Sequence, residues 1–236
     1  MRLICKVPDN LLASFHDETM KIAYNVTDDQ VDVFLHGIVG DEYNQTDSLS
    51  IAQILSANRG KTVNLRVNSP GGLAYDGVAI YNAIDSHDGP TVGIIEGRAG
   101  SAASLAVMAC DTVKCHSGGV FHPHYSLVMA FGHQAEIRDA LAIQERLDED
   151  LEAIYAEASG RSLEQVKADL LGPNGDGTVF SADQAKSAGY VDEVIQHNKR
   201  KESADSKTSP AARLNLYAAH NAELRTKVLD TLRRRG

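Results

Sequence analysis

Ser101 occupies a place in the sequence that suits a nucleophile. It follows a short apolar segment, TVGIIEG (91–97), and it precedes small residues that are typical of a closely packed helix. A serine between a strand and a helix lies beside unpaired N–H groups and partial positive charge, which can stabilise a developing oxyanion. Serine is also a favoured N-cap, so this local pattern alone favours capping over catalysis. Ser104, one turn further on, is a weaker candidate because it lies deeper in the expected helix.

A serine hydroxyl needs a base before it can act as a nucleophile. Three histidines follow the expected helix, His116, His122 and His124, and all lie on or beside strand-like segments. His122 and His124 are two residues apart and would share one face of a strand. The chemistry that this combination predicts is acyl transfer. The local sequence leaves open which histidine faces the serine.

A second signal is Asn68-Ser69-Pro70-Gly71-Gly72, which follows the β-branched segment KTVNLRV (61–67). Proline fixes its own φ, and paired glycines let the backbone turn and approach a bound group closely. Such a loop at the carboxyl end of a strand can donate an N–H to an oxyanion. Taken alone, the same five residues would be an ordinary tight turn.

The elements that must position these groups alternate between strand and helix. The sequence predicts strands over 22–26, 31–37, 61–67 and 91–97, and helices over 47–57, 78–84 and 99–109. This alternation is typical of βαβ units, so the expected fold class is α/β with a mostly parallel sheet.

The second half of the chain begins with the longest helical pattern, from Ala135 to Ser159, which ends at Gly160. Ser162 opens the next expected helix, and a polar, Gly-rich loop follows over 172–177. The segment FSADQAKSAGYVDEVI (180–195) predicts a short helix and a last strand. Beyond it, the sequence resembles a linker and then a thin amphipathic helix.

Composition narrows the class of protein. With 236 residues, 43% hydrophobic and 23% charged, the chain suits one globular domain plus a tail, and no apolar run is long enough to span a membrane. The first ten residues lack the order of a secretory signal, and three cysteines without metal-ligand spacing favour a reducing compartment, so we expect a cytoplasmic protein.

The net charge of −9 argues against nucleic acid as the main partner. The charge is uneven, because Asn198 to Gly236 carries ten Lys or Arg and four Asp or Glu. This basic tail could bind an acidic partner or another subunit, or it could be a solvated segment. We therefore divide the chain into a domain over 1–197 and a basic linker and tail over 198–236.

Three motifs in order resemble the Clp protease proteolytic subunit (ClpP) family, and they are most similar to its phage members that act as head-maturation (prohead) proteases. The resemblance covers roughly residues 30–196. VNSPGG (67–72) matches the family's oxyanion loop, GRAGSAASLAVMA (97–109) its nucleophile motif, and ACDTVKCHSGGVFHPH (109–124) the stretch before its histidine. Two later segments also match: SGRSLEQVKADL (159–170) and FSADQAKSAGYVDEVI (180–195).

This resemblance implies a role for each matching residue. Ser101 becomes the nucleophile of a serine endopeptidase, and His124, 23 residues later, becomes its general base. The backbone N–H groups of Gly71, Gly72 and Ala102 become the oxyanion donors. The resemblance implies no metal and no organic cofactor.

The acid of the triad is less well defined. Strict counting back from Ser181 reaches Gly177, while Asp176 is one residue earlier, so Asp176 is the predicted acid and Asp169 a distant alternative. Its role would be to fix the histidine tautomer and to stabilise the imidazolium. If Asp176 points elsewhere, the enzyme would depend on a Ser-His dyad.

The resemblance also implies an architecture and partners. We expect a ClpP/crotonase-type fold in which the helix over 135–159 is the protruding handle that joins two rings of identical subunits. An extended polypeptide substrate would lie beside residues 126–132 by β-augmentation. A phage-type member would act on capsid or scaffold proteins in the host cytoplasm or inside the prohead, and an ATP-driven unfoldase partner is less expected. Two hypotheses for the basic tail are that it tethers the enzyme to the scaffold and that it is removed by self-cleavage.

Three other readings compete with this one. A crotonase would need acids in place of Ser101 and His124 and a CoA pocket. A peptidase of the signal peptide peptidase A type would use a Ser-Lys pair, with Lys61 or another remote lysine as its base. A structural or scaffold-linked subunit that has lost turnover is the non-enzyme alternative.

Overall fold

The computed structural model describes residues 24–42 and 46–196. Its strands are β1 (Tyr24–Val26), β2 (Gln30–Val39), β3 (Thr62–Gly72), β4 (Thr91–Gly100), β5 (Thr112–His116), β6 (Val120–His122), β7 (Phe180–Ser181) and β8 (Glu193–Ile195). Its helices are α2 (Ser48–Ala57), α3 (Ala74–Asp85), α4 (Ala102–Val107), α5 (Gln134–Ser159), α6 (Leu163–Leu171) and α7 (Ala182–Ser187). The basic tail lies outside the described residues.

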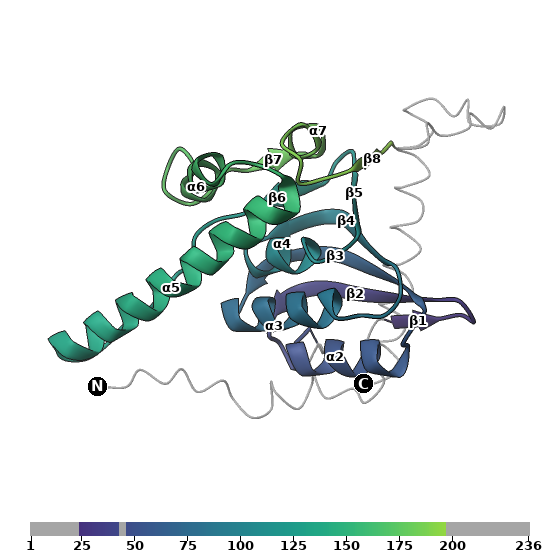
Figure 1. Ribbon diagram of the computed structural model, residues 1–236, viewed down its shortest axis with the longest axis horizontal. Helices are drawn as coiled ribbons and strands as arrows, with labels where there is room; N and C mark the ends of the chain where they lie inside the picture. The colour runs from purple at the N-terminus through teal and green to yellow at the C-terminus, as the bar shows by residue number, and fades with distance from the viewer. Residues whose placement is uncertain (1–23, 43–45, 197–236) are drawn as a thin grey trace, which may run out of the picture. The chain divides into compact units, whose positions relative to one another are not determined.

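One mixed sheet organises the fold (Figure 1). Its strand order is β1-β2-β3-β4-β5-β8, and β6 pairs with both β4 and β7. The pairs β2–β3, β3–β4, β4–β5, β5–β8 and β4–β6 are parallel. The pairs β1–β2 and β6–β7 are antiparallel. The α/β class with repeated β-α units and a mostly parallel sheet is therefore confirmed.

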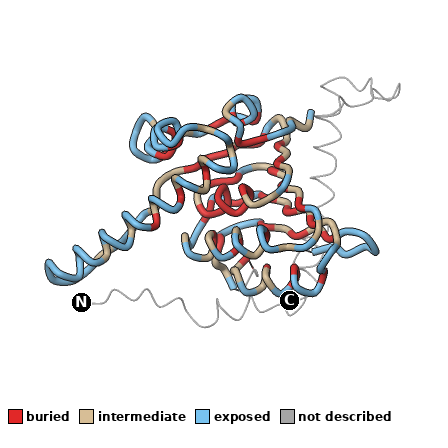
Figure 2. Tube along the Cα trace, in the orientation of Figure 1, coloured by how far each residue is buried: buried red, intermediate tan, exposed pale blue. Residues whose placement is uncertain are grey.

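The core lies between one face of the sheet and its helices. Alternate strand residues face it, because side chains along a strand point to opposite sides; they include Val31, Val33, Leu35, Val63, Leu65, Val67 and Ile95. All six residues of α4 are buried, and Figure 2 shows this helix among the most buried parts of the trace. Small residues let α3 and α4 pack this closely, because a Cβ on Gly77 of α3 would lie only 2.8 Å from the Cβ of Ala102.

Three boundaries that concern the site differ from the sequence prediction. Residues 68–72, predicted as a loop, continue β3, and β4 extends to Gly100. The strands continue through register shifts, with Gly71 opposite Ile38 of β2 and Ser69 opposite Ala99 of β4. Such an irregularity accommodates Pro70 within a strand. The predicted helix over 99–109 is shorter and begins only after Ser101.

Helix α5 extends away from the sheet in Figure 1, as predicted for the helix over 135–159. It ends at Gly160 in the left-handed conformation, with φ of 67°. Its buried residues, Leu147, Leu151 and Tyr155, all belong to the half nearer the sheet. Within the described ranges, no helix is long and apolar enough to cross a membrane. Cys110 and Cys115 are free thiols, and Cys5 lies outside these ranges.

Candidate active site

Ser101 has an unusual backbone conformation. Its φ of 51° and ψ of −128° make it the one non-glycine residue with positive φ among those that the structure describes. Its N–H donates to the carbonyl of His122 at 2.9 Å, and its carbonyl accepts from the N–H of Ser104 at 2.8 Å. Its side chain makes no capping hydrogen bond. The capping role that the local sequence favoured is therefore not adopted, and a strained serine whose hydroxyl does not cap the helix is typical of functional sites.

The end of β3 lies directly against Ser101. Gly71 has φ of 103°, and a Cβ placed on it would lie 2.4 Å from the Cβ of Ser101 and 3.1 Å from the nitrogen of Ala102. A Cβ on Gly100 would lie 2.8 Å from the carbonyl oxygen of Pro70. The two backbones approach this closely only because both positions are glycine.

His124 shares a cavity with Ser101. Its Nδ1 lies 2.6 Å from the carbonyl oxygen of Tyr125, and a carbonyl can only accept, so Nδ1 carries the proton. The Nε2 lone pair is then the basic one, which is the tautomer that a general base for a serine requires.

His122 has a different environment. Its ring is buried, its Nδ1 accepts from the guanidinium of Arg98 at 2.8 Å, and its Nε2 donates to the main-chain carbonyl of Asp176 at 2.9 Å. Burial lowers the pKa of His122, and the positive charge of Arg98 lowers it further against the opposing hydrogen bond to Asp176. Strand β6 ends at His122, so the two histidines do not share a strand, although their rings are 5.5 Å apart. His122 thus holds the loop of residues 172–177 against the strand.

The structure brings this loop to His124, but not through the Asp176 carboxylate. A Cβ on Gly177 would lie 2.6 Å from the Cβ of His124. Within the described residues the hydrogen bond of the His124 ring goes to Tyr125, while the main chain of Asp176 binds His122. Asp176 itself is exposed.

The backbone N–H groups predicted as oxyanion donors lie around Ser101, but their surroundings differ. Ala102 is the first residue of α4, where an N–H has no partner within the helix. The N–H of Gly71 donates to the buried hydroxyl of Ser69 at 3.0 Å. Gly72 packs against Val39, since a Cβ there would lie 2.1 Å from its carbonyl oxygen.

The Clp protease family model matches residues 16–198, most of the chain. The chain belongs to the Clp protease family. It is therefore a serine peptidase that acts on polypeptides, and peptidases of this family typically work as oligomers.

Tyr155 of this Clp-family chain was not recognised as a site residue from the sequence, and Ser104, considered there as a weaker nucleophile, instead supports the Ser101 turn. The hydroxyl of Ser104 donates to the carbonyl of Ser101 at 2.7 Å, so the Tyr155 hydroxyl, 2.7 Å away, donates to Ser104. Both side chains are fully buried, and burial raises the pKa of Tyr155 well above its usual range. The apolar positions 147, 151 and 155 on the long helix were the available signal, but their spacing indicates only a buried stripe.

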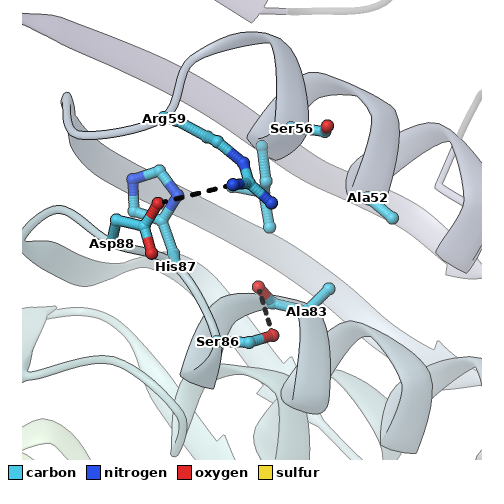
Figure 3. A pocket seen from close by; sticks show the side chains of 8 residues that line it. Ala52, Ser56, Arg59, Ala83, Ser86, His87 and Asp88 are labelled. Carbon is cyan, nitrogen blue, oxygen red and sulfur yellow. Dashed lines mark hydrogen bonds and ion pairs between the residues drawn. The ribbon is translucent and has the colours of Figure 1, made fainter.

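Larger hollows of this Clp-family chain lie away from Ser101. Figure 3 shows a pocket of about 210 Å³ between the ends of α2 and α3, where Arg59 pairs with Asp88 at 3.8 Å. The cavity that Ser101 and His124 line is smaller, at about 20 Å³. Lys61, the base of the Ser-Lys alternative, donates instead to Thr27 and lies at the opposite end of β3 from Gly71. At about 3.3 Å per strand residue it is roughly 30 Å away.

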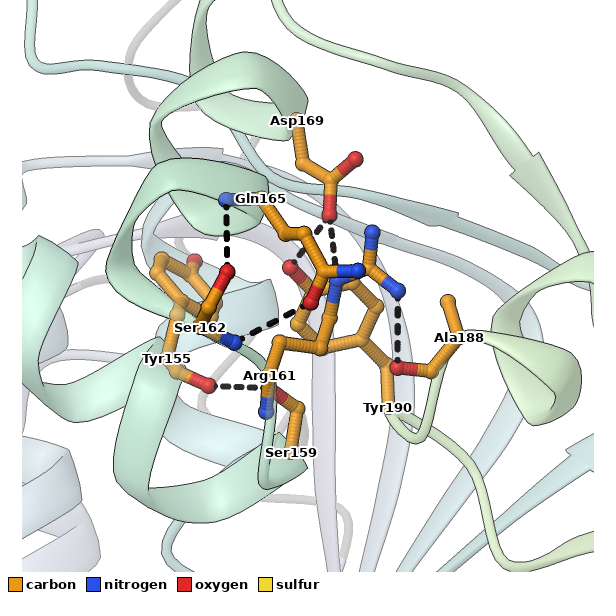
Figure 4. Close-up of polar contacts among 8 residues, drawn as sticks. All are labelled: Tyr155, Ser159, Arg161, Ser162, Gln165, Asp169, Ala188 and Tyr190. Carbon is orange, nitrogen blue, oxygen red and sulfur yellow. Dashed lines mark hydrogen bonds and ion pairs between the residues drawn. The ribbon is translucent and has the colours of Figure 1, made fainter.

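A polar network holds the start of the loop of residues 172–177, here called the acid loop, in place (Figure 4). The Asp169 carboxylate binds the Arg161 guanidinium at 2.8 Å and accepts from the Tyr190 hydroxyl at 2.8 Å. The main chain of Asp169 also accepts from the N–H of Thr178, two residues after Asp176. Asp169, the alternative acid, is thus engaged in anchoring this loop.

Proposed function

We propose that Ser101, His124 and Asp176 carry the peptidase reaction of this chain. The observation that supports this most strongly is the strained Ser101 elbow in one cavity with His124, whose Nε2 is the basic nitrogen. Ser101 attacks the peptide carbonyl while His124 takes the hydroxyl proton at Nε2. His124 returns this proton to the leaving amine, and water then hydrolyses the acyl-enzyme by the same route.

The oxyanion would bind the N–H groups of Ala102 and Gly71. Because the Gly71 N–H donates to Ser69 in this structure, it would exchange that partner for the oxyanion during the reaction. Gly72 would hold the end of β3 against Val39 of β2. Asp176 would act through its charge on the imidazolium, since the carbonyl of Tyr125 already fixes the tautomer of His124.

The direct test is reaction with a fluorophosphonate probe, followed by intact mass and peptide mapping. We expect one adduct, on Ser101, which is absent in Ser101→Ala and strongly reduced in His124→Ala. Ser86→Ala, at an exposed serine that follows α3, is the matched serine control. No adduct in a folded and assembled sample would support the alternative of an inactive structural subunit.

We also propose that the chain is a phage-type member that cleaves capsid or scaffold proteins during head assembly. This rests on the resemblance of its motifs and of the 23-residue spacing between Ser101 and His124 to the phage members. Co-expression with the phage capsid and scaffold proteins, followed by sequencing of new N-termini, tests it. Cuts that also occur with Ser101→Ala, or no cuts at all, would contradict the proposal.

Ring assembly through α5 is part of this proposal. Ile137, Leu141 and Ile143 are about half exposed on the part of the helix that extends from the sheet, and Phe131 just before it is fully exposed. Apolar side chains in such a position are typical of subunit contacts. Residues 126–132 form no strand in the chain, so they would become one only on pairing with a substrate or a subunit. Light scattering tests assembly, and a stable monomer would contradict it.

A further inference from the structure

The cavity beside Ser101 is small and has a closed floor. Its volume is about 20 Å³, and it is lined by Ala74, Ser101, Ala102, Leu105, His124, Ser126, Leu151 and Tyr155. A cavity needs about 10–15 Å³ on this measure to hold one water molecule. The space therefore corresponds to roughly one methyl or hydroxyl group.

The side chains that line the cavity are themselves packed against other buried residues. Leu105, Leu151 and Tyr155 are 2%, 6% and 1% exposed. The Tyr155 ring packs edge-on against Phe121 and Tyr190, and its hydroxyl is engaged with Ser104. Side chains packed at this density do not move aside for extra methylene groups without strain.

Ser126 adds one polar group to the lining. Its N–H donates to Asp148 at 2.9 Å and its carbonyl accepts from Gln144 at 2.6 Å, so both sides of its main chain are fixed to α5. Its hydroxyl is buried and has no hydrogen-bond partner in the structure. A buried hydroxyl without a partner favours a ligand that offers it a hydrogen bond.

We infer that the cavity is the subsite for the P1 side chain and that it selects a small residue, with serine preferred, alanine and glycine accepted, and leucine or phenylalanine rejected. This rests on the proposed function of Ser101. The P1 Cα is bonded to the carbonyl carbon that Ser101 attacks, so the P1 side chain must enter the space adjoining Ser101. Ser126, Leu151 and Tyr155 then determine specificity, Ser126 by its hydroxyl and the other two by volume.

The first test compares peptides that differ only at P1, as serine, alanine or leucine, by their kcat/KM. One misplaced methylene changes discrimination by about 10- to 200-fold, so we expect alanine to exceed leucine at least tenfold. We expect Leu151→Ala to reduce or reverse this ratio. Leu147→Ala, one turn earlier and buried but outside the cavity lining, is the matched control and should keep it. Leu151→Val serves if the alanine variant does not fold, with a smaller shift in the same direction.

The second test removes the hydroxyl. Ser126→Ala should lower the serine-to-alanine ratio at P1 at least threefold and leave the alanine-to-leucine ratio unchanged. Fluorophosphonate labelling, which carries no P1 side chain, separates the two hypotheses. Labelling of Ser101 together with equal or faster cleavage after leucine would overturn the small-residue subsite alone. Absence of labelling would overturn the proposed function and this inference with it.

Discussion

Gly71→Ala tests whether the close approach of β3 to Ser101 is needed for catalysis. The new Cβ would lie 2.4 Å from the Cβ of Ser101, about 1 Å short of an ordinary contact. Either Ser101 or the end of β3 must therefore move by about that amount. The matched control is Gly37→Ala, because Gly37 has a similar φ of 91° but no atom within 4 Å of its Cβ position.

Both variants place alanine at positive φ, which costs about 1–2 kcal/mol of stability in each. Only Gly71→Ala also displaces the nucleophile relative to the oxyanion donors. A misplacement of about 1 Å costs on the order of 100-fold in rate, and loss of one oxyanion donor about 100- to 1,000-fold. We therefore expect Gly71→Ala to lower the rate constant for fluorophosphonate labelling at least 100-fold, and Gly37→Ala to change it less than about threefold.

The assay is the second-order labelling rate, measured by intact mass, with thermal unfolding recorded for both variants. Labelling is measured well below the lower of the two melting temperatures, so that loss of folded protein does not imitate loss of reactivity. Equal labelling rates in the two variants would refute the reasoning, because the contact between Gly71 and Ser101 would then have no catalytic consequence.

Three further predictions concern the residues behind the site. Asp176→Asn should lower the labelling rate at least tenfold without changing the melting temperature, whereas Asp169→Asn should destabilise the fold by about 2 kcal/mol, because the partly buried Arg161 guanidinium loses its charged partner; the reverse pattern would make Asp169 the acid. The pKa of His122 in the folded chain lies below 6.5, so as the pH falls the unfolded chain protonates this histidine before the folded chain does. Stability is therefore lost from pH 6.5 down to the lowered pKa. His122→Gln can keep both hydrogen bonds and should remove this part of the pH dependence of the melting temperature, and an unchanged pH dependence would contradict the assignment. Tyr155→Phe removes the donor to Ser104 and should cost about 1 kcal/mol of stability and several-fold in labelling, with Tyr125→Phe as the control that leaves the Ser101 turn intact.

The sequence predicted the elements better than it predicted their ends. The strand over 61–67 was recognised from its β-branched residues, but its continuation to Gly72 was missed because proline and paired glycine ordinarily stop a strand. The continuation depends on pairing with β2 and β4, which are distant in sequence. In the same way, the helix predicted from residue 99 starts later because Ala99 and Gly100 pair with β6, which the local sequence does not show.

The site was predictable to the extent that motifs define it. Motif order indicated Ser101 and His124, and the structure brings both to one cavity. Local patterns could not reveal that His122 holds the loop of residues 172–177, because its ring binds the main chain of Asp176 across 54 residues of sequence. The hydrogen bond between the His124 ring and Tyr125 joins neighbouring residues, but the sequence does not show which acceptor the ring takes.

Residues 122–124 connect the three parts of the site. The carbonyl of His122 accepts from the N–H of Ser101, its ring binds the carbonyl of Asp176, and His124 follows two residues later. Nucleophile, base and acid loop are thus attached to one short segment, so a displacement of β6 would move all three together rather than separate them. Since β6 itself pairs with β4, which leads into Ser101, the relative position of serine and histidine is set by backbone pairing. We therefore expect the Ser101–His124 arrangement to survive substitution of Asp176, and to fail when the β4–β6 pairing is broken.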